Sequence, residues 1–180
     1  MTTWNIDTAH SGIHFAVRHM VVSRVRGKFG NWRGALDWNE TEPLRSQVEV
    51  RIAAASIDTG IAERDAHLRS ADFLDVAAHP EITFTSKRVE AQGGERYRLF
   101  GDITIRGVTR EIALDVEAGG RAKDPWGNER AGFSARAALD RKDFGLAWNQ
   151  VLEAGGVLVG DRIEVEIELE AVRVAEQKAA

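Results

Sequence analysis

The chain is poor in the residues that carry covalent and metal chemistry. Its 180 residues include no cysteine, which excludes disulfides, thiolate nucleophiles and cysteine-based zinc or iron–sulfur sites. Lysine and arginine number 24 against 28 acidic residues, and the net charge of -4 argues against nucleic acid as a partner. No apolar run approaches the roughly 20 residues that a membrane-spanning helix needs.

The first residues also lack the features of a secretion signal. The segment Met1–Asp7 has neither a basic region nor an apolar stretch, so no signal peptide is visible. The missing cysteines suit a reducing compartment. We therefore expect a cytoplasmic protein.

What the sequence does have is alternation. Apolar residues recur at every second position, most clearly over residues 163–170, where isoleucine, valine and leucine alternate with four glutamates. This period is typical of strands with one dry and one wet face. About eight such runs predict one all-β domain over residues 1–180, either a sandwich or a single eight-stranded antiparallel barrel. Runs near ten residues favour the barrel, which is either filled by side chains or holds one small ligand.

One region breaks the alternation. Between residues 61 and 73 the apolar period lengthens, which predicts a short helix near one end of the barrel. Asp58, Thr59 or Gly60 is the expected N-cap. The helix is either a lid that moves or a plug that does not. A second helical turn is predicted near residues 20–22.

Several ordered blocks resemble the YceI-like family, bacterial polyisoprenoid-binding proteins with a lipocalin-like barrel. The resemblance extends from Trp4 to Val172, nearly the whole chain. The blocks that carry it are Trp4-Asn5-Ile6-Asp7, His10-Ser11, Ser56-Ile57-Asp58-Thr59-Gly60, Arg64-Asp65 followed by His67-Leu68-Arg69-Ser70 and Asp72-Phe73, His79-Pro80-Glu81-Ile82-Thr83-Phe84, residues 101–109, and Arg141 with Asp143-Phe144-Gly145-Leu146.

The resemblance implies an apolar interior that binds a long-chain amphiphile, such as a polyisoprenoid or an isoprenoid quinone, for transport or storage. No cofactor is expected beyond such a bound lipid. Each candidate for the lining also fits a plain packed core, although a small inward residue such as Ala135 leaves volume that a ligand could fill. The predicted lining residues are Phe15, Val17, Phe29, Leu36, Val50, Ile52, Leu68, Phe73, Phe84, Leu99, Ile103, Leu114, Phe133, Ala135, Val165 and Ile167.

Polar contacts to a headgroup are assigned to Arg64 and His67 of the predicted helix, because arginine suits phosphate or carbonyl oxygen. The alternative is a solvated helix face, in which these side chains form local ion pairs with neighbours such as Asp65. Tryptophan suits an opening with one wet and one dry side, although it suits any barrel rim equally. The tryptophans considered for the mouth are Trp32, Trp38, Trp126 and Trp148.

Two other functional classes stay open. An enzyme would be an isomerase or hydrolase of an amphiphilic substrate, with Asp58, Asp65, His67 and Asp72 close enough in sequence for acid–base work. A scaffold would bind a protein through a barrel edge or outer face, and edge pairing could form a homodimer. Without a metal-binding spacing of histidines or a nucleophile motif, we expect neither a metal site nor catalytic residues.

Overall fold

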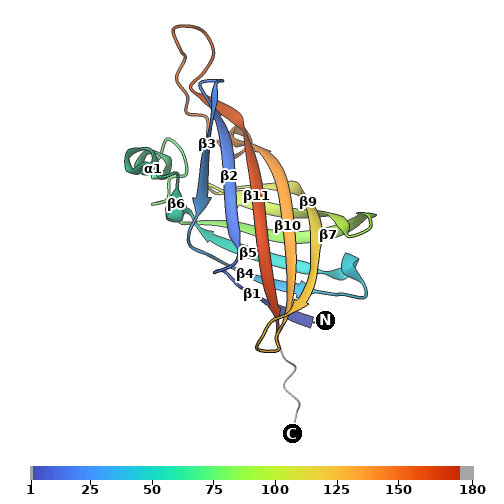
Figure 1. Ribbon diagram of the computed structural model, residues 1–180. Coiled ribbons are helices and arrows are strands. Elements are labelled where there is room, and N and C mark those ends of the chain that lie inside the picture. The colour runs from blue at the N-terminus through green and yellow to red at the C-terminus, as the bar shows by residue number, and fades with distance from the viewer. Residues whose placement is uncertain (1, 175–180) are drawn as a thin grey trace.

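In the computed structural model, which describes residues 2–174, β-strands form one antiparallel sheet that closes on itself (Figure 1). The strands are β1 (Thr2–Ile6), β2 (Gly12–His19), β3 (Ser23–Phe29), β4 (Trp32–Trp38), β5 (Gln47–Ala53), β6 (Ile57–Asp58), β7 (Glu81–Gly93), β8 (Arg96–Ile105), β9 (Val108–Lys123), β10 (Glu129–Asp140) and β11 (Val159–Arg173). Short helices are η1 (Pro43–Arg45), η2 (Ala54–Ser56), α1 (Ala62–Arg69) and η3 (Arg141–Phe144).

In three places two short strands lie end to end and together take the position of one long strand of the barrel. We call each such pair, and each long strand, a stave. Strands β1 and β2 lie one after the other along β11, where Ile6 opposes Ala171 and Gly12 opposes Glu168. In the same way β4 pairs with β1 and β3 pairs with β2, so β4 and β3 form the next stave. Strand β5 pairs with β4 and β6 pairs with β3, and these two form the third. Counted as staves, the sheet is the predicted closed eight-stranded barrel, and that prediction is confirmed.

Each stave pairs with its neighbours in the chain, so the barrel has up-and-down topology. The longest ladder joins β10 and β11, from Arg130 opposite Val172 to Asp140 opposite Arg162. Because alternate side chains face opposite sides of a strand, a closed sheet directs one half of the alternation inward. The glutamates of β11 therefore face solvent, while the apolar residues between them face the interior.

One end of the barrel is plugged by aromatic side chains, and we call it the closed end. Trp4 of β1 is fully buried and packs with Leu36, Ala131 and Ala171. Its ring centroid lies 5.2 Å from that of Trp38. The sheet closes where β1 pairs with β11. The cluster around Trp4 therefore packs against the strands that close the barrel.

An arginine ties three segments together at the closed end. Arg130 of β10 donates to Asp7 at 2.9 Å and to Asp124 at 3.0 Å, and it also pairs with Glu170. The bond from Arg130 lowers the pKa of Asp7 to about 2. Asp124 has its pKa lowered to about 2, chiefly by the side-chain bond from Asn128 in the β9–β10 turn. Charge therefore reinforces the apolar plug from outside.

The helix is shorter than predicted and starts differently. It covers Ala62–Arg69 rather than residues 61–73, since the chain forms tight turns from Ser70 onward. Its N-cap residue is Ile61, which has no capping side chain, so the predicted caps are wrong. The side chain of Asp58 instead accepts the N–H of Gly60 at 2.8 Å, and Thr59 bonds to the buried Asp65.

The predicted helical turn near residues 20–22 is also wrong. These residues form the tip of the β2–β3 hairpin, where His19 pairs with Ser23. Met20 and Val21 adopt φ values of 52° and 64°, in the left-handed region. The hairpin tip rises beside the long connection between η3 and β11, at what we call the open end of the barrel (Figure 1).

Candidate functional site: an apolar cavity inside the barrel

The interior of the barrel contains two adjoining apolar cavities. The lower cavity, toward the closed end, has a volume of about 200 Å³, and the upper cavity, toward the open end, about 470 Å³. Ile52 and Ile103 line both, so the two cavities meet at the middle of the barrel. Ligand pockets in proteins usually measure roughly 300–1,000 Å³. The hollow is therefore large enough for one extended small molecule.

The lower cavity is lined by inward residues of most staves. Ala135 of β10 lies opposite Val116 and Ile167, and its short side chain leaves the space between them open. Tyr97 and Gln47 add a few polar atoms. The predicted lining residues found in this cavity alone are Leu36, Val50, Phe84, Leu99, Leu114, Phe133, Ala135, Val165 and Ile167.

The upper cavity lies between the β2–β3 hairpin and helix α1. The predicted residues that line it alone are Phe15, Val17, Phe29, Leu68 and Phe73. Together with Ile52 and Ile103, every predicted lining residue faces one of the two cavities. Contact of these residues with a ligand stays a prediction.

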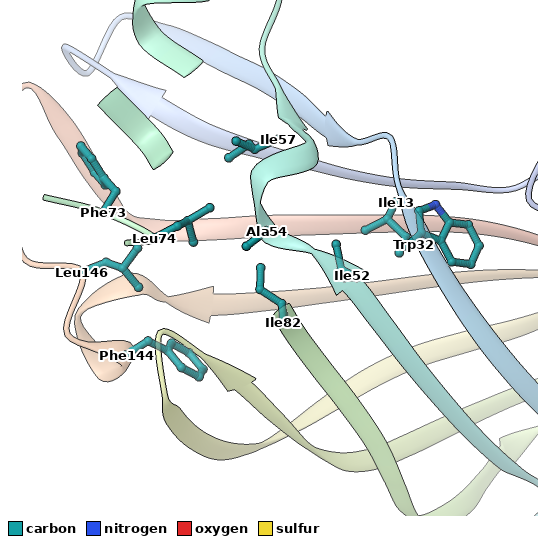
Figure 2. Close-up of a cluster of buried hydrophobic side chains, with 10 residues drawn as sticks. All are labelled: Ile13, Trp32, Ile52, Ala54, Ile57, Phe73, Leu74, Ile82, Phe144 and Leu146. Carbon is teal, nitrogen blue, oxygen red and sulfur yellow. The ribbon is translucent and has the colours of Figure 1, made fainter. Parts of the chain in front are cut away.

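Packed core and cavity lining are not exclusive roles for the predicted residues. Figure 2 shows Ile52 and Phe73 within a buried cluster that joins the strands to the segment after α1, and both also line a cavity. Trp32, Leu146 and Phe144 belong to the same cluster and line a cavity too, although they were not among the predicted residues. The wall of the hollow is thus also the core that holds the barrel together.

Two glycines make room for aromatic rings in the lining. Gly27 of β3 lies opposite Phe15, and a Cβ placed on Gly27 would overlap the phenyl ring. A Cβ placed on Gly101 of β8 would likewise overlap the phenyl ring of Phe84, on the neighbouring strand β7. At these two sites the missing side chain lets a large ring lie flat against the neighbouring strand.

The mouth of the upper cavity is built around His67. Its ring packs edge-on against Trp148, with centroids 4.6 Å apart, and against Phe73, at 5.1 Å. Its Nε2 atom lies 2.8 Å from Asp72 Oδ2, which fixes the ring orientation. An imidazole held by an aromatic pair and a carboxylate can present its other nitrogen to a polar group at the mouth.

The other charged residues of α1 mostly hold the helix in place. Asp65 is only 6% exposed and accepts both the N–H and the hydroxyl of Thr59, at 2.9 and 2.6 Å. Arg69 donates to the carbonyls of Ala55 and Ile57, both at 2.8 Å. Asp65 and Arg69 therefore form neither a headgroup site nor a solvated face with local ion pairs.

Arg64 lines the upper cavity and is tied to the same turn. Its Nε donates to the Thr59 hydroxyl at 2.7 Å, and one terminal nitrogen donates to the Thr59 carbonyl at 2.9 Å. The remaining terminal nitrogen has no hydrogen-bond partner within residues 2–174. A headgroup oxygen could use it, so the role predicted for Arg64 and His67 stays open.

Arg141 holds the loop beside the mouth and was not among the predicted site residues. It is 4% exposed, and it donates to the carbonyls of Leu146 at 2.6 Å and Trp148 at 2.8 Å. Burial lowers the pKa of Arg141, although Asp161 lies 3.4 Å away. Its side chain positions Trp148 and so shapes the mouth. No periodicity marks such a residue, because its partners are backbone atoms of a loop.

The four tryptophans fall in different places. Trp148 lines the upper cavity near its mouth, whereas the other three do not line that cavity. Trp32 and Trp38 line the lower cavity, and Trp126 is 82% exposed in the β9–β10 turn at the closed end. The alternation of apolar residues in the sequence could not distinguish a tryptophan on the inner wall from one at the rim.

The barrel wall is incomplete between β9 and β10. Their pairing ends where Asp115 opposes Arg136, although both strands continue and keep their other partners. A polar hollow of about 710 Å³ lies outside this gap. Ile112 and Ala137 line both this hollow and the lower cavity, so one layer of side chains separates the interior from solvent here.

One group of residues within 2–174 has the composition of a metal site. Asp7, His10 and Glu170 bring one potential ligand atom each within 4.8 Å of the others. Arg130 already bonds to Asp7 and Glu170, and it supplies the positive charge that a cation would bring. The group is therefore explained as an ion-pair network at the closed end.

An up-and-down barrel of eight staves around an apolar hollow defines a lipocalin-like small-ligand-binding architecture. The YceI-like domain matches residues 4–171, and the chain belongs to this family. A UPF0312 protein of Pectobacterium carotovorum is 44% identical over 137 residues, which cover 76% of this chain and 71% of that protein. Protein YceI of Escherichia coli O157:H7 is 41% identical, with the same coverage of 76% and 71%.

Solved structures agree on the fold. The YceI protein of Campylobacter jejuni has a TM-score of 0.72 at 31% identity, covering 88% of this chain and 90% of that one. BcnA of Burkholderia cenocepacia has a TM-score of 0.82 at 19% identity, covering 92% and 99%. A polyisoprenoid-binding domain from Saccharophagus degradans has a TM-score of 0.66 at 15% identity, covering 95% and 98%. At such low identities the last two show the fold alone.

Within residues 2–174, none of the helices combines the length and the apolar character needed to cross a bilayer.

Proposed function

We propose that this protein binds a long-chain amphiphile, such as a polyisoprenoid or an isoprenoid quinone, inside the barrel and carries or stores it. The observation that carries the proposal is the pair of adjoining apolar cavities that meet at Ile52 and Ile103. Family membership supports it, as does the shared fold of the Saccharophagus degradans domain, which is described as polyisoprenoid-binding.

The size of the barrel suits a hydrocarbon chain. The twelve residues of β10 extend about 40 Å along the strand. A tilt of about 40° would make the barrel roughly 30 Å tall. Each CH₂ removed from water contributes about 0.8 kcal/mol, whereas association costs on the order of 4–15 kcal/mol. A short acyl chain would therefore bind weakly, and a chain of many carbons could bind tightly without a strong polar anchor.

The polar end of the ligand would lie at the open end. At the closed end Trp4 packs with its apolar neighbours, whereas polar side chains of Arg64 and His67 line the upper cavity near the mouth. The tail would then extend past Ile52 and Ile103 toward Ala135. This orientation keeps the charged or hydroxylated group in contact with water.

Extraction tests the proposal directly. Organic extraction of the protein purified from cells, followed by mass spectrometry, should release a long-chain isoprenoid or acyl lipid. Protein stripped of lipid should take up a dispersed polyprenyl alcohol. An empty extract combined with no uptake would reject the carrier function.

A variant pair locates the site. Ala135→Trp should fill the lower cavity and lower uptake at least about tenfold, which corresponds to roughly 1.4 kcal/mol of binding free energy. The matched control is Ala138→Trp, on the exposed face of the same strand, which should leave uptake unchanged. Equal uptake by both variants would show that the ligand does not occupy the space beside Ala135. Circular dichroism checks that both variants keep the barrel.

The enzyme alternative has one observation in its favour, the imidazole–carboxylate pair of His67 and Asp72. If the protein is an enzyme, bound lipid should change chemically over hours, and His67→Ala should abolish the change. Recovery of unaltered lipid from the wild type would leave the carrier function in place.

A further inference from the structure

Large apolar side chains are exposed on two loops at the open end. Val21 and Val22 at the tip of the β2–β3 hairpin are 68% and 83% exposed, and Met20 beside them is 43% exposed. On the connection between η3 and β11, Val151 is 80% and Val157 40% exposed. We call these five residues the apolar crest. Single exposed apolar residues are ordinary, but two neighbouring loops that both carry them form a patch.

The two loops hold each other in a defined shape. The N–H of Met20 donates to the carbonyl of Leu158 at 2.9 Å, and a Cβ on Gly156 would lie 3.8 Å from Val21 Cγ2. Val151 and Val157 form an antiparallel bridge within the second loop. The crest is therefore a built surface, and Figure 1 shows both loops rising together above the barrel.

The backbone at the hairpin tip does not explain the choice of side chains. Met20 and Val21 both have positive φ, a conformation that glycine, asparagine and aspartate adopt most readily. For a β-branched residue such as Val21 it is an outlier. Turn chemistry alone would favour small polar residues here, so the apolar side chains are better explained by what they contact.

The crest continues into the upper cavity. His19 and Leu158 line that cavity, and each is the immediate neighbour of a crest residue in the chain. Trp148 lines it from the same connection that carries Val151 and Val157. A hydrocarbon chain leaving the mouth would therefore meet the crest before it met bulk water.

The outer face of the β2–β3 hairpin is basic. Arg18 and Arg24 form a cross-strand pair close to the tip, with Arg26 and Lys28 further down the same hairpin. All four are exposed, and Arg24 pairs with Glu164 at 3.0 Å. Arg18, Arg26 and Lys28 have no acidic partner within residues 2–174. This local excess stands out because the whole chain has a net charge of -4.

We propose that the apolar crest inserts into the surface of an anionic lipid bilayer, so that the mouth of the cavity lies against the membrane. This inference rests on the proposed function, because a lipid ligand has the bilayer as its source. Apolar side chains that enter the interface, flanked by arginine and lysine that attract anionic headgroups, are the combination that binds proteins to membrane surfaces. Protruding loops also fit a deformable bilayer better than the flat, closely packed surface of a protein partner.

Vesicle flotation with the full chain tests the proposal. The probes are vesicles of phosphatidylcholine alone and vesicles in which one lipid in three is phosphatidylglycerol. The wild type should float with the anionic vesicles, less with the neutral ones, and less at high salt because salt screens the attraction. Failure of the wild type to float with either vesicle would overturn the proposal.

A double substitution isolates the crest. Val21→Asn with Val22→Ser removes exposed apolar surface, and asparagine suits the positive φ of residue 21, so the hairpin should fold. Vesicle binding should fall at least tenfold. Trp126→Ser, which removes an exposed apolar side chain at the closed end, is the matched control and should bind like the wild type. Equal binding by the double variant and the wild type would overturn the proposal.

Loading with lipid separates this inference from the proposed function. The double variant should take up dispersed polyprenyl alcohol as the wild type does, yet acquire it more slowly from vesicles. If the wild type binds vesicles but never takes up lipid, the membrane site stands and the carrier function fails. If instead the double substitution breaks up a wild-type dimer and neither protein binds vesicles, the crest is a contact between copies of the chain and the proposal is wrong.

Discussion

The closed end and the open end of the barrel both carry tryptophan and other apolar residues, but these side chains differ in how deeply they are buried. At the closed end Trp4 is fully buried, β1 pairs with β11, and Arg130 links three acidic residues. At the open end Trp148 is only partly buried, and valines reach solvent. The same kind of side chain is therefore packed inside at Trp4 and partly exposed at Trp148.

This difference shows how a barrel can hold a cavity without losing its fold. Side chains that line an empty cavity lose van der Waals contacts, so packing in other parts of the barrel has to stabilise the fold. The plug at the closed end and the cluster in Figure 2, which joins the strands to the segment after α1, supply dense packing at the two sides of the hollow.

The largest expected effect is on stability at the closed end. Trp4→Ala should lower the free energy of unfolding by about 3–5 kcal/mol, because it leaves a cavity where a fully buried ring packs. Trp148→Ala at the mouth should cost less stability and should weaken lipid binding instead. Urea unfolding and lipid uptake measure the two effects. Equal losses of stability in both variants would contradict the comparison.

A smaller effect is expected where α1 is fastened beside the upper cavity. Asp65→Ala should lower the free energy of unfolding by about 1–3 kcal/mol, because the partly buried N–H and hydroxyl of Thr59 lose their acceptor. Lipid should also leave the cavity faster if α1 acts as a lid. Asp143→Ala, at an exposed position, is the control and should change stability by less than about 0.5 kcal/mol. An unchanged release rate in the destabilised variant would make α1 a fixed plug.

The smallest effect concerns acid. The pKa of Asp7 falls from 3.8 to about 2 on folding, so its contribution to stability is complete above about pH 4 and is lost as the pH drops toward 2. Arg130→Met removes the main cause of this shift. The thermal midpoint of the wild type should therefore fall more steeply between about pH 4 and 2 than that of the variant. Parallel curves would show that Arg130 does not couple Asp7 to folding.

Much of the site could be predicted from the sequence because of the strand period. Alternation identified the inward residues of long strands, such as Val165 and Ile167 of β11, and both line the lower cavity. It could not find Arg141, whose acceptors are loop carbonyls. Nor could it place the exposed Val22, because an apolar residue in a turn looks like the end of a strand.

The sequence by itself determined the staves, their inward faces and the family, because a period of two and ordered motifs are local properties of the chain. Tertiary structure alone decided that the hollow stays open at Ala135, that Trp4 is buried at one end, and that Met20 meets Leu158 at the other. These features depend on which distant segments a closing sheet brings together. Closure sets the volume inside and the neighbours at each rim, and neither is encoded in any single stretch of residues.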